Sequence, residues 1–366
     1  MPDSSTRRLR VGVILGGRSS EREVSLSSGR QVYYNLDRGR YERVALFLDG
    51  AGRLWRLPEK LVLQNTCPDI EARLAADAQR LPLEDLPDHV DLVFNALHGK
   101  YGDDGCIQGA LELLGIPYTG SGVLACALSL DKPFAHALLA AAGFSVPRTT
   151  VVADHDWLHR PEEVRARIAA AVGYPAVVLP AREGSSIGVS VVADGSALDG
   201  ALAEAFCYDR QALVEEFLDG LEFSVILVGN GLADNSIGNQ GNDGVLAFLP
   251  TETTTENDFM TYDDKYMPGR SQKITPPRVP PATVARIQSE AVRAFRAMGF
   301  QGYARMDGFL MPDGRILFTD PNSTSGMAPS SFMFHQAAEA GLTPVALIDR
   351  ILDLALEAHA AKRGPL

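Results

Sequence analysis

The sequence YARMDGFLMPDGRILFTDPNSTSGMAPSSF, residues 303–332, decides the fold. Polar and apolar residues alternate in residues 304–310 and again in residues 315–318, which predicts two half-buried β-strands. Between them, Asp313-Gly314 is typical of a two-residue hairpin turn, because such turns require positive φ. The stretch is therefore predicted to form an antiparallel hairpin.

One face of this predicted hairpin gathers charged and polar groups. Counting back from the two-residue turn places Asp307 opposite Asp320, and the same register places Arg305 opposite Asn322. Since side chains alternate along a strand, all four share one face. Opposed carboxylates repel by up to about 1 kcal/mol, and an oxygen-seeking cation such as Mg²⁺ would remove that cost. The alternative interpretation is the solvated outer face of an edge hairpin.

Length, composition and charge narrow the kind of protein that this chain can be. The 366 residues suggest two or three domains, and 46% hydrophobic with 22% charged residues is ordinary for a globular chain. A net charge of −12 argues against nucleic acid or an anionic membrane as the main partner. The four cysteines form no CxxC pair, which favours free thiols in a reducing compartment. With no apolar run typical of a signal peptide or a membrane span, a cytoplasmic protein is predicted.

The first third of the chain is predicted to be one α/β domain. An apolar run at 11–15 leads into a glycine turn and a polar helix start, as in a doubly wound unit. A second strand at 90–94 leads into a glycine-rich loop that contains His98 and Asp103, a plausible rim of a site. A lone histidine is also commonly structural, so both interpretations of His98 stay open. A third strand is predicted within 116–122.

Further along, helices are predicted from Lys132 to about 142, from 161 to 171, over 284–298 and over 343–358. Strands are predicted at 174–179, 212–218 and 221–228, and residues 229–277 are predicted to include a mobile loop. The first of these strands leads into Gly184-Ser185-Ser186-Ile187-Gly188. The backbone N–H groups and the two hydroxyls of this loop could cover and bind a phosphate. A plain β-turn is the alternative there.

Taken together, these stretches resemble the D-alanine–D-alanine ligases of the ATP-grasp superfamily, from about Val11 to about Leu354. The carrying motifs, besides the hairpin, are GGRSSEREVSLSSG (16–29), NALHGKYGDDGCIQGALELLGIPYTGSG (95–122), SLDK (129–132), PAREGSSIGVS (180–190), VEEFLDGLEF (214–223) and YDDKY (262–266). The resemblance implies an α+β ATP-grasp protein in which two α+β domains clasp ATP. The N-terminal doubly wound α/β domain would cover residues 1–120, the central domain 121–214 and the C-terminal domain 215–366.

The resemblance also implies an activity. ATP would phosphorylate the carboxylate of one D-alanine, and the amine of a second would displace phosphate, giving a dipeptide for peptidoglycan precursor synthesis. The implied cofactors are ATP and Mg²⁺, for which Mn²⁺ could substitute. The partners would be small amino acids, with no nucleic acid and no membrane, and the implied assembly is a homodimer. The alternatives are a divergent paralogue, either a dipeptide ligase of a specialised pathway or an ATP-impaired binding module.

Family roles carry over residue by residue. The catalytic set that the resemblance implies is Glu21, Ser185, Tyr266, Arg305 and Gly326. Substrate binding falls to His98, Asp103 and Ser331, and ATP binding to Lys132, Glu215, Leu218, Glu222 and Lys265. The metal ligands are Asp307, Asp320 and Asn322.

Three positions depart from the family pattern, and all lie on the ATP and metal side. Leu179 stands where the family has lysine, Asp320 where it has glutamate, and Ser325 where it has proline. A charge-assisted hydrogen bond is worth about 1.5–3 kcal/mol, so losing the lysine is expected to weaken ATP binding about tenfold to a hundredfold. Arg182 is a candidate to swing in and replace the missing charge.

Overall fold

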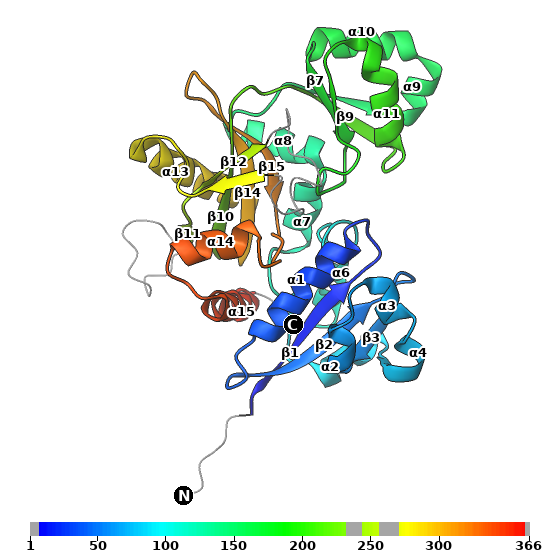
Figure 1. Cartoon of the computed structure of the whole chain (residues 1–366), viewed down its shortest axis with the longest axis vertical. Coiled ribbons are helices and arrows are strands. Elements are labelled where there is room, and N and C mark those ends of the chain that lie inside the picture. Colours follow the sequence, from blue (N-terminus) through cyan, green and yellow to red (C-terminus); the bar gives the residue numbers. More distant parts are fainter. Residues whose placement is uncertain (1–6, 232–243, 256–270, 363–366) are drawn as a thin grey trace, which may run out of the picture.

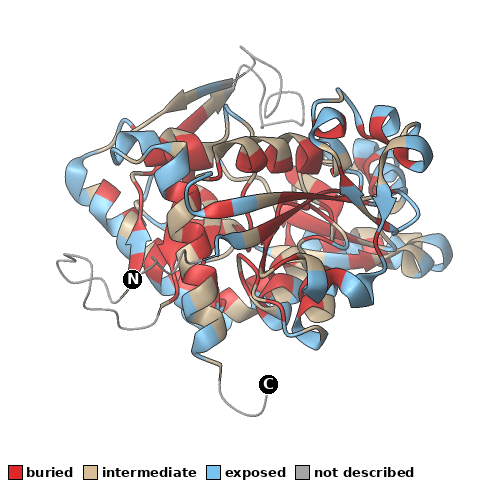
Figure 2. Ribbon diagram, turned by 90° about the horizontal axis from the view of Figure 1, so that it is seen from below, coloured by how far each residue is buried: buried red, intermediate tan, exposed pale blue. Residues whose placement is uncertain are grey.

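The computed structural model describes residues 7–231, 244–255 and 271–362, which form three lobes, each built on its own β-sheet (Figure 1). The mixed α/β class predicted from the sequence is confirmed. Buried residues concentrate along the sheets and on the helix faces that cover them (Figure 2). No single described helix is long and apolar enough to cross a membrane; α7 (Val123–Leu130) and α8 (Lys132–Ala141) pass that test only as a pair, bent by 106°.

The first lobe has the strand order β4-β3-β2-β1-β5, with β1 parallel to both β2 and β5. Its strands are β1 (Leu9–Gly16), β2 (Tyr41–Leu48), β3 (Leu54–Leu57), β4 (Gln79–Arg80) and β5 (Leu92–Asn95). Its helices are α1 (Arg22–Asn35), α2 (Glu59–Val62), α3 (Cys67–Glu71), α4 (Leu74–Asp77), the 3₁₀ turn η1 (Leu83–Asp85), α5 (Leu86–His89) and α6 (Cys106–Leu113).

From Val11 to Leu15, strand β1 is apolar because both of its faces are buried there. Val11, Val13 and Leu15 pack in a cluster with α1, whereas Ile14 packs in another with α6. The strands predicted at 11–15 and 90–94 are confirmed. The strand predicted within 116–122 is wrong, since only a single bridge joins Tyr118 to Val93.

The middle lobe carries an antiparallel sheet in the order β6-β9-β7-β8. Its elements are β6 (Thr149–Ala153), α9 (Asp154–His159), α10 (Pro161–Ala171), β7 (Ala176–Pro180), β8 (Ser190–Val192), η2 (Gly195–Ala197), α11 (Leu198–Phe206) and β9 (Gln211–Glu216). Val178 and Val214 pack beneath α10 and α11. Side chains alternate along β7, so Val177 and Leu179 lie on the opposite face.

The third lobe has the order β13-β12-β10-β14-β15, with β11 also paired to β10. Its elements are β10 (Leu221–Gly229), β11 (Val245–Ala247), β12 (Thr251–Thr255), β13 (Ser271–Ile274), α13 (Pro281–Ala297), β14 (Tyr303–Leu310), β15 (Ile316–Asn322), α14 (Phe332–Glu339) and α15 (Pro344–Ala360). Helices α7 (Val123–Leu130) and α8 (Lys132–Ala141) pack in its core beside α13. Strands β11, β12 and β13 thus lie within the segment 229–277. The mobile loop predicted in this segment stays a prediction, because residues 232–243 and 256–270 lie outside those described.

The lobes share buried surface. Residues of α14 and α15 pack in the same cluster as β1 and α1, which joins the first lobe to the third. The predicted division into 1–120, 121–214 and 215–366 stays a prediction. Within it, α7 and α8 precede the middle sheet in sequence but pack on the third sheet.

The hairpin of β14 and β15 has the predicted pairs, Asp307 with Asp320 and Arg305 with Asn322. The predicted two-residue turn is wrong. Met311 pairs with Arg315 across a three-residue loop that ends at Gly314, whose φ of 86° suits glycine. A β-bulge after Asp307 restores the register, so the turn error and the bulge cancel before the polar pairs are reached.

Candidate active site

Two adjoining pockets lie between the lobes, the first lined by residues of all three and the second by residues of the middle and third lobes. The first is lined by Glu21, His98, Asp103, Lys132, Ser185, Glu222, Lys273, Arg305, Asp307, Asp320, Asn322, Gly326 and Ser331, among others. The second is lined by Lys132, Val177, Leu179, Ser185, Glu215, Leu218, Glu222, Asp307, Phe309 and Asp320, among others. Every predicted site residue that the structure describes therefore lines one or both pockets. Lys265 and Tyr266 lie outside the described residues.

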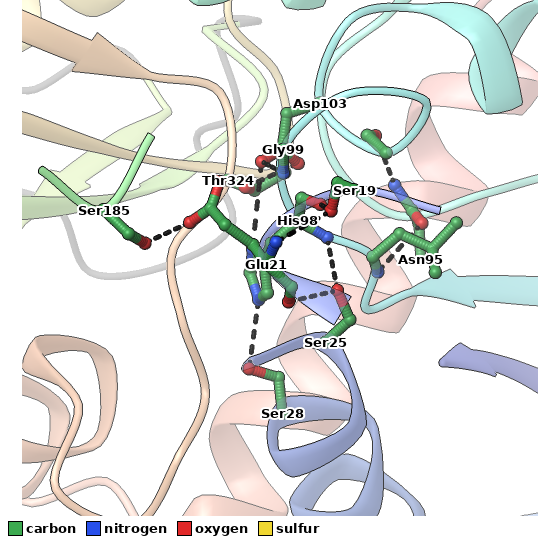
Figure 3. A network of polar contacts seen from close by, with 12 residues as sticks. Ser19, Glu21, Ser25, Ser28, Asn95, His98, Gly99, Asp103, Ser185 and Thr324 are labelled. Carbon is green, nitrogen blue, oxygen red and sulfur yellow. Dashed lines mark hydrogen bonds and ion pairs between the residues drawn. The ribbon is translucent and has the colours of Figure 1, made fainter. Parts of the chain in front are cut away.

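At one end of the first pocket, Glu21 joins two lobes. It occupies the N-cap position of α1 and is buried, and the hydroxyl of Ser185 in the middle lobe donates a hydrogen bond to it (Figure 3). A Cβ at Gly184 would lie 2.5 Å from Glu21 Oε2, closer than van der Waals contact permits. A side chain at position 184 would push against the Glu21 carboxylate, so glycine suits this close approach of the Gly-Ser-Ser loop to Glu21.

Beside Glu21 lie two titratable groups with shifted pKa values. Burial, and then the positive charge of Arg305, lowers the pKa of His98 to about 4. Burial, and then the negative charge of Glu21, raises the pKa of Asp103 to about 8. Both side chains are thus mainly uncharged near pH 7, and Glu21 is the carboxylate towards which an ammonium group would be drawn.

The same two residues connect the first lobe to the loop after β15. The hydroxyl of Thr324 donates to Asp103 at 2.9 Å (Figure 3). His98 Nε2 lies 3.0 Å from Ser28 Oγ, which also accepts from the Met327 backbone at 3.0 Å. These bonds fix the loop that contains Gly326 against the wall of the pocket.

The polar face of the hairpin forms the floor shared by both pockets, so its interpretation as a solvated outer face is wrong. Arg305 Nε lies 2.9 Å from both carboxylate oxygens of Asp307. Ser224 Oγ donates to Asp307 at 2.6 Å, and Lys132 Nζ lies 3.4 Å from Asp320 Oδ1.

Asp307, Asp320 and Asn322 offer hard oxygen donors, the chemistry that Mg²⁺ prefers. The Asn322 side chain is fixed by its Nδ2, which donates to the Asp307 carboxylate at 3.2 Å and to the Asp320 backbone oxygen at 2.8 Å. No group of three or more His, Cys, Asp or Glu among the described residues could hold a metal, and this site itself offers two carboxylates and one amide. Arg305 and Lys132 balance the two carboxylates, and a divalent cation would meet the same electrostatic need.

The second pocket pairs an apolar wall with a buried carboxylate. Leu179, Leu218 and Phe309 contribute apolar surface, and burial raises the pKa of Glu215. Among the described residues, Glu215 Oε1 has no hydrogen-bond partner, and neither has Nδ1 of His136, 3.6 Å away. Sequence reasoning missed His136, although it lies one helical turn after Lys132. Such a slot can hold a flat apolar ring that carries an amine donor.

The three departures from the family pattern have distinct surroundings. Leu179 faces the second pocket, where Lys132 is the only cation among the described lining residues. The proposed replacement by Arg182 is not supported, because Arg182 binds Asp209 with two hydrogen bonds of 2.7 and 2.9 Å and lines neither pocket. Ser325 is buried, and its hydroxyl has no hydrogen-bond partner within the described ranges.

The chain is similar to known proteins over nearly its whole length. Residues 10–121 match the model of the D-ala D-ala ligase N-terminus, and residues 138–353 match that of the C-terminus. The chain is 36% identical to a D-alanine--D-alanine ligase of Deinococcus radiodurans, covering 95% of this chain and 98% of that one. It is 33% identical to the enzyme of Geobacillus thermodenitrificans, covering 97% and 98%.

Solved structures are similar as well. VanG D-Ala:D-Ser ligase from Enterococcus faecalis has a TM-score of 0.81 at 29% identity, covering 95% of this chain and 100% of that one. The D-alanine-D-alanine ligase from Coxiella burnetii has a TM-score of 0.78 over 97% of this chain and 96% of that one; at 24% identity, this likeness shows the fold alone.

Proposed function

The chain belongs to the D-alanine–D-alanine ligase family, and we propose that it joins two D-alanines, or related small amino acids, in an ATP-dependent reaction that supplies peptidoglycan precursors. The observation that carries the proposal is the convergence of the site. The predicted catalytic, nucleotide and metal residues that the structure describes come from three lobes and line two adjoining pockets. One pocket suits two small zwitterions and the other suits a nucleotide.

We assign ATP to the second pocket. Its apolar wall would hold the adenine, with Glu215 and the chain at Leu218 meeting the polar edge, and Glu222 would bind the ribose hydroxyls. Lys132 and Lys265 would bind phosphates. Mg²⁺ would be held by Asp307, Asp320 and Asn322, where it would neutralise charge on the triphosphate.

In the first step, Glu21 binds the ammonium of the first D-alanine and so orients its carboxylate towards the phosphate side. A carboxylate oxygen attacks the γ-phosphorus, the bond to the ADP oxygen breaks, and an acyl phosphate forms. Water must be kept out because an acyl phosphate hydrolyses. The Ser185 contact with Glu21 brings the middle lobe over this part of the pocket.

In the second step, the amine of the second amino acid attacks the acyl carbon, loses a proton, and phosphate leaves. Negative charge then grows on the carbonyl oxygen, where Arg305 and the Gly326 N–H would stabilise it. Ser331, the N-cap of α14, would bind the acceptor carboxylate, and Ser185 with Tyr266 would organise the acceptor side. We further propose a cytoplasmic homodimer that needs neither nucleic acid nor membrane.

The test is ADP release and dipeptide formation by the purified protein with ATP, Mg²⁺ and one of several D- and L-amino acids. D-Alanine is expected to support both. Turnover with another amino acid alone would instead indicate a specialised ligase. If no amino acid supports turnover while calorimetry detects D-alanine binding, the ATP-impaired binding module replaces the proposal.

Restoring the family lysine at position 179 is expected to lower the KM for ATP about tenfold to a hundredfold, the value of one charge-assisted hydrogen bond. Leu179 faces the nucleotide pocket, so a lysine there can reach bound phosphate. Leu179→Met is the matched control, because it keeps the volume without the charge. The KM for ATP is measured by steady-state kinetics with ATP as the varied substrate. An unchanged KM in Leu179→Lys would mean that the missing charge does not limit ATP binding.

A further inference from the structure

The acceptor end of the first pocket contains a lysine that the proposed mechanism does not use. Lys273 of β13 lines this pocket together with Arg305, Ser330, Ser331 and Phe332. It lies far in sequence from the hairpin and from α14, and pairs with Thr253 of β12, which places it at the pocket edge of the third sheet.

The hydrogen bonding of Lys273 does not neutralise its charge. Its Nζ donates to the Ser330 backbone oxygen at 2.7 Å and lies 4.5 Å from the centre of the Phe332 ring. Within the part of the chain that the structure describes, no carboxylate lies within ion-pair distance of it. Burial, and then the positive charge of Arg305, lowers the Lys273 pKa, which indicates an ammonium held without enough negative charge nearby.

Arg305, the other cation at this end, is already engaged. Its Nε and Nη2 bind the carboxylate of Asp307 at 2.8–2.9 Å. The first turn of α14 adds the partial positive charge of a helix N-terminus beside Ser331. Positive charge thus gathers here, and the arginine is directed towards the metal-side carboxylate.

We propose that Lys273 binds the carboxylate of the second amino acid and is the residue that makes a free carboxylate on the acceptor a requirement. This inference rests on the proposed function. In this proposal, Ser331 and the α14 N-terminus orient the acceptor carboxylate and Lys273 neutralises its charge. Arg305 then remains available to stabilise the reacting carbonyl oxygen. Losing a charge-assisted contact of this kind lowers affinity about tenfold to a hundredfold.

The experiment is a competition between two acceptors in one reaction. The enzyme receives ATP, Mg²⁺, D-alanine and an equal concentration of D-alaninamide, whose carboxylate is replaced by a neutral amide. Mass spectrometry gives the ratio of D-alanyl-D-alanine to its amide. Lys273→Met is expected to lower that ratio at least about tenfold, and Lys273→Arg, which keeps the charge, to retain most of it. A ratio does not depend on how much of the variant is folded.

Gln272→Met is the matched control. Gln272 is the neighbour of Lys273 on the same strand, is exposed and does not line the pocket, so its variant is expected to keep the wild-type ratio. An unchanged ratio in Lys273→Met, or the absence of both products from a folded Lys273→Met, would overturn the inference and leave the proposed function standing. A wild-type protein that makes neither product would overturn both.

Discussion

Replacing Asp307 with asparagine is expected to reduce ADP release at least about a thousandfold, because a carboxylate that holds the divalent cation supports several kcal/mol of charge stabilisation. Asp307 is at the centre of the hairpin face, within hydrogen-bond distance of Arg305, Ser224 and Asn322. Asparagine keeps the shape and one acceptor oxygen. What it removes is the negative charge that opposes both the arginine and a metal.

Asp313→Asn is the matched control for this substitution. Asp313 lies at the exposed turn of the same hairpin, where it pairs with Arg315 at 2.7 Å, and its variant is expected to stay within about threefold of wild type. The rates are measured by coupled ADP release over a series of Mg²⁺ concentrations, with thermal unfolding as the check on folding. Activity of Asp307→Asn within tenfold of wild type would contradict the assignment of the hairpin face as the metal site.

The hairpin illustrates what the sequence can predict. Alternation places Asp307 and Asp320 on facing strands, but their exact pairing depends on counting back from the turn, and it is right because the longer loop and the bulge after Asp307 offset each other. The turn prediction is wrong because Asp-Gly suits both a two-residue turn and the end of a three-residue loop. The bulge after Asp307 has no clear local signal in the sequence.

The residues that sequence reasoning missed are those whose roles come only from distant neighbours. His136 lies on a helix that reads as ordinary, and its contact with Glu215 spans from α8 to β9. Lys273 lies on a short strand beside residues outside those described, and nothing in its sequence surroundings points to Phe332 or Ser330. The family resemblance supplied most of the candidate site, but it cannot supply roles at positions that its motifs do not cover.

The electrostatics of the described site link the two halves of the proposed reaction. Each metal-side carboxylate is balanced by a cation that also serves one of the pockets, since Lys132 faces the nucleotide pocket and Arg305 faces the amino-acid pocket. Asp307 and Asp320 would help to hold a divalent cation, whose positive charge would weaken both ion pairs. Metal binding is thus expected to direct Lys132 towards phosphate and Arg305 towards the reacting carbonyl, so the charges needed for chemistry become available together.

Arg305→Met is accordingly expected to lower kcat for dipeptide formation about a hundredfold to a thousandfold, the usual effect of removing one oxyanion donor. The loss should fall on the second step, so the acyl phosphate would survive long enough to meet water. We therefore expect more than one ADP released for each dipeptide formed, whereas the KM for ATP should change little. Methionine keeps much of the apolar stem of the side chain.

Arg315→Met provides the control for Arg305→Met. Arg315 is on the same hairpin but exposed, and its partner is Asp313 at the turn. Its variant is expected to keep one ADP per dipeptide and a rate near that of wild type. ADP and dipeptide are quantified in the same samples, so coupling is measured independently of enzyme concentration. Arg305 also balances the charge of Asp307. If Arg305→Met releases less ADP but still one ADP per dipeptide, the arginine acts only through the metal-side carboxylate. An unchanged kcat would show that Arg305 takes no part in the mechanism.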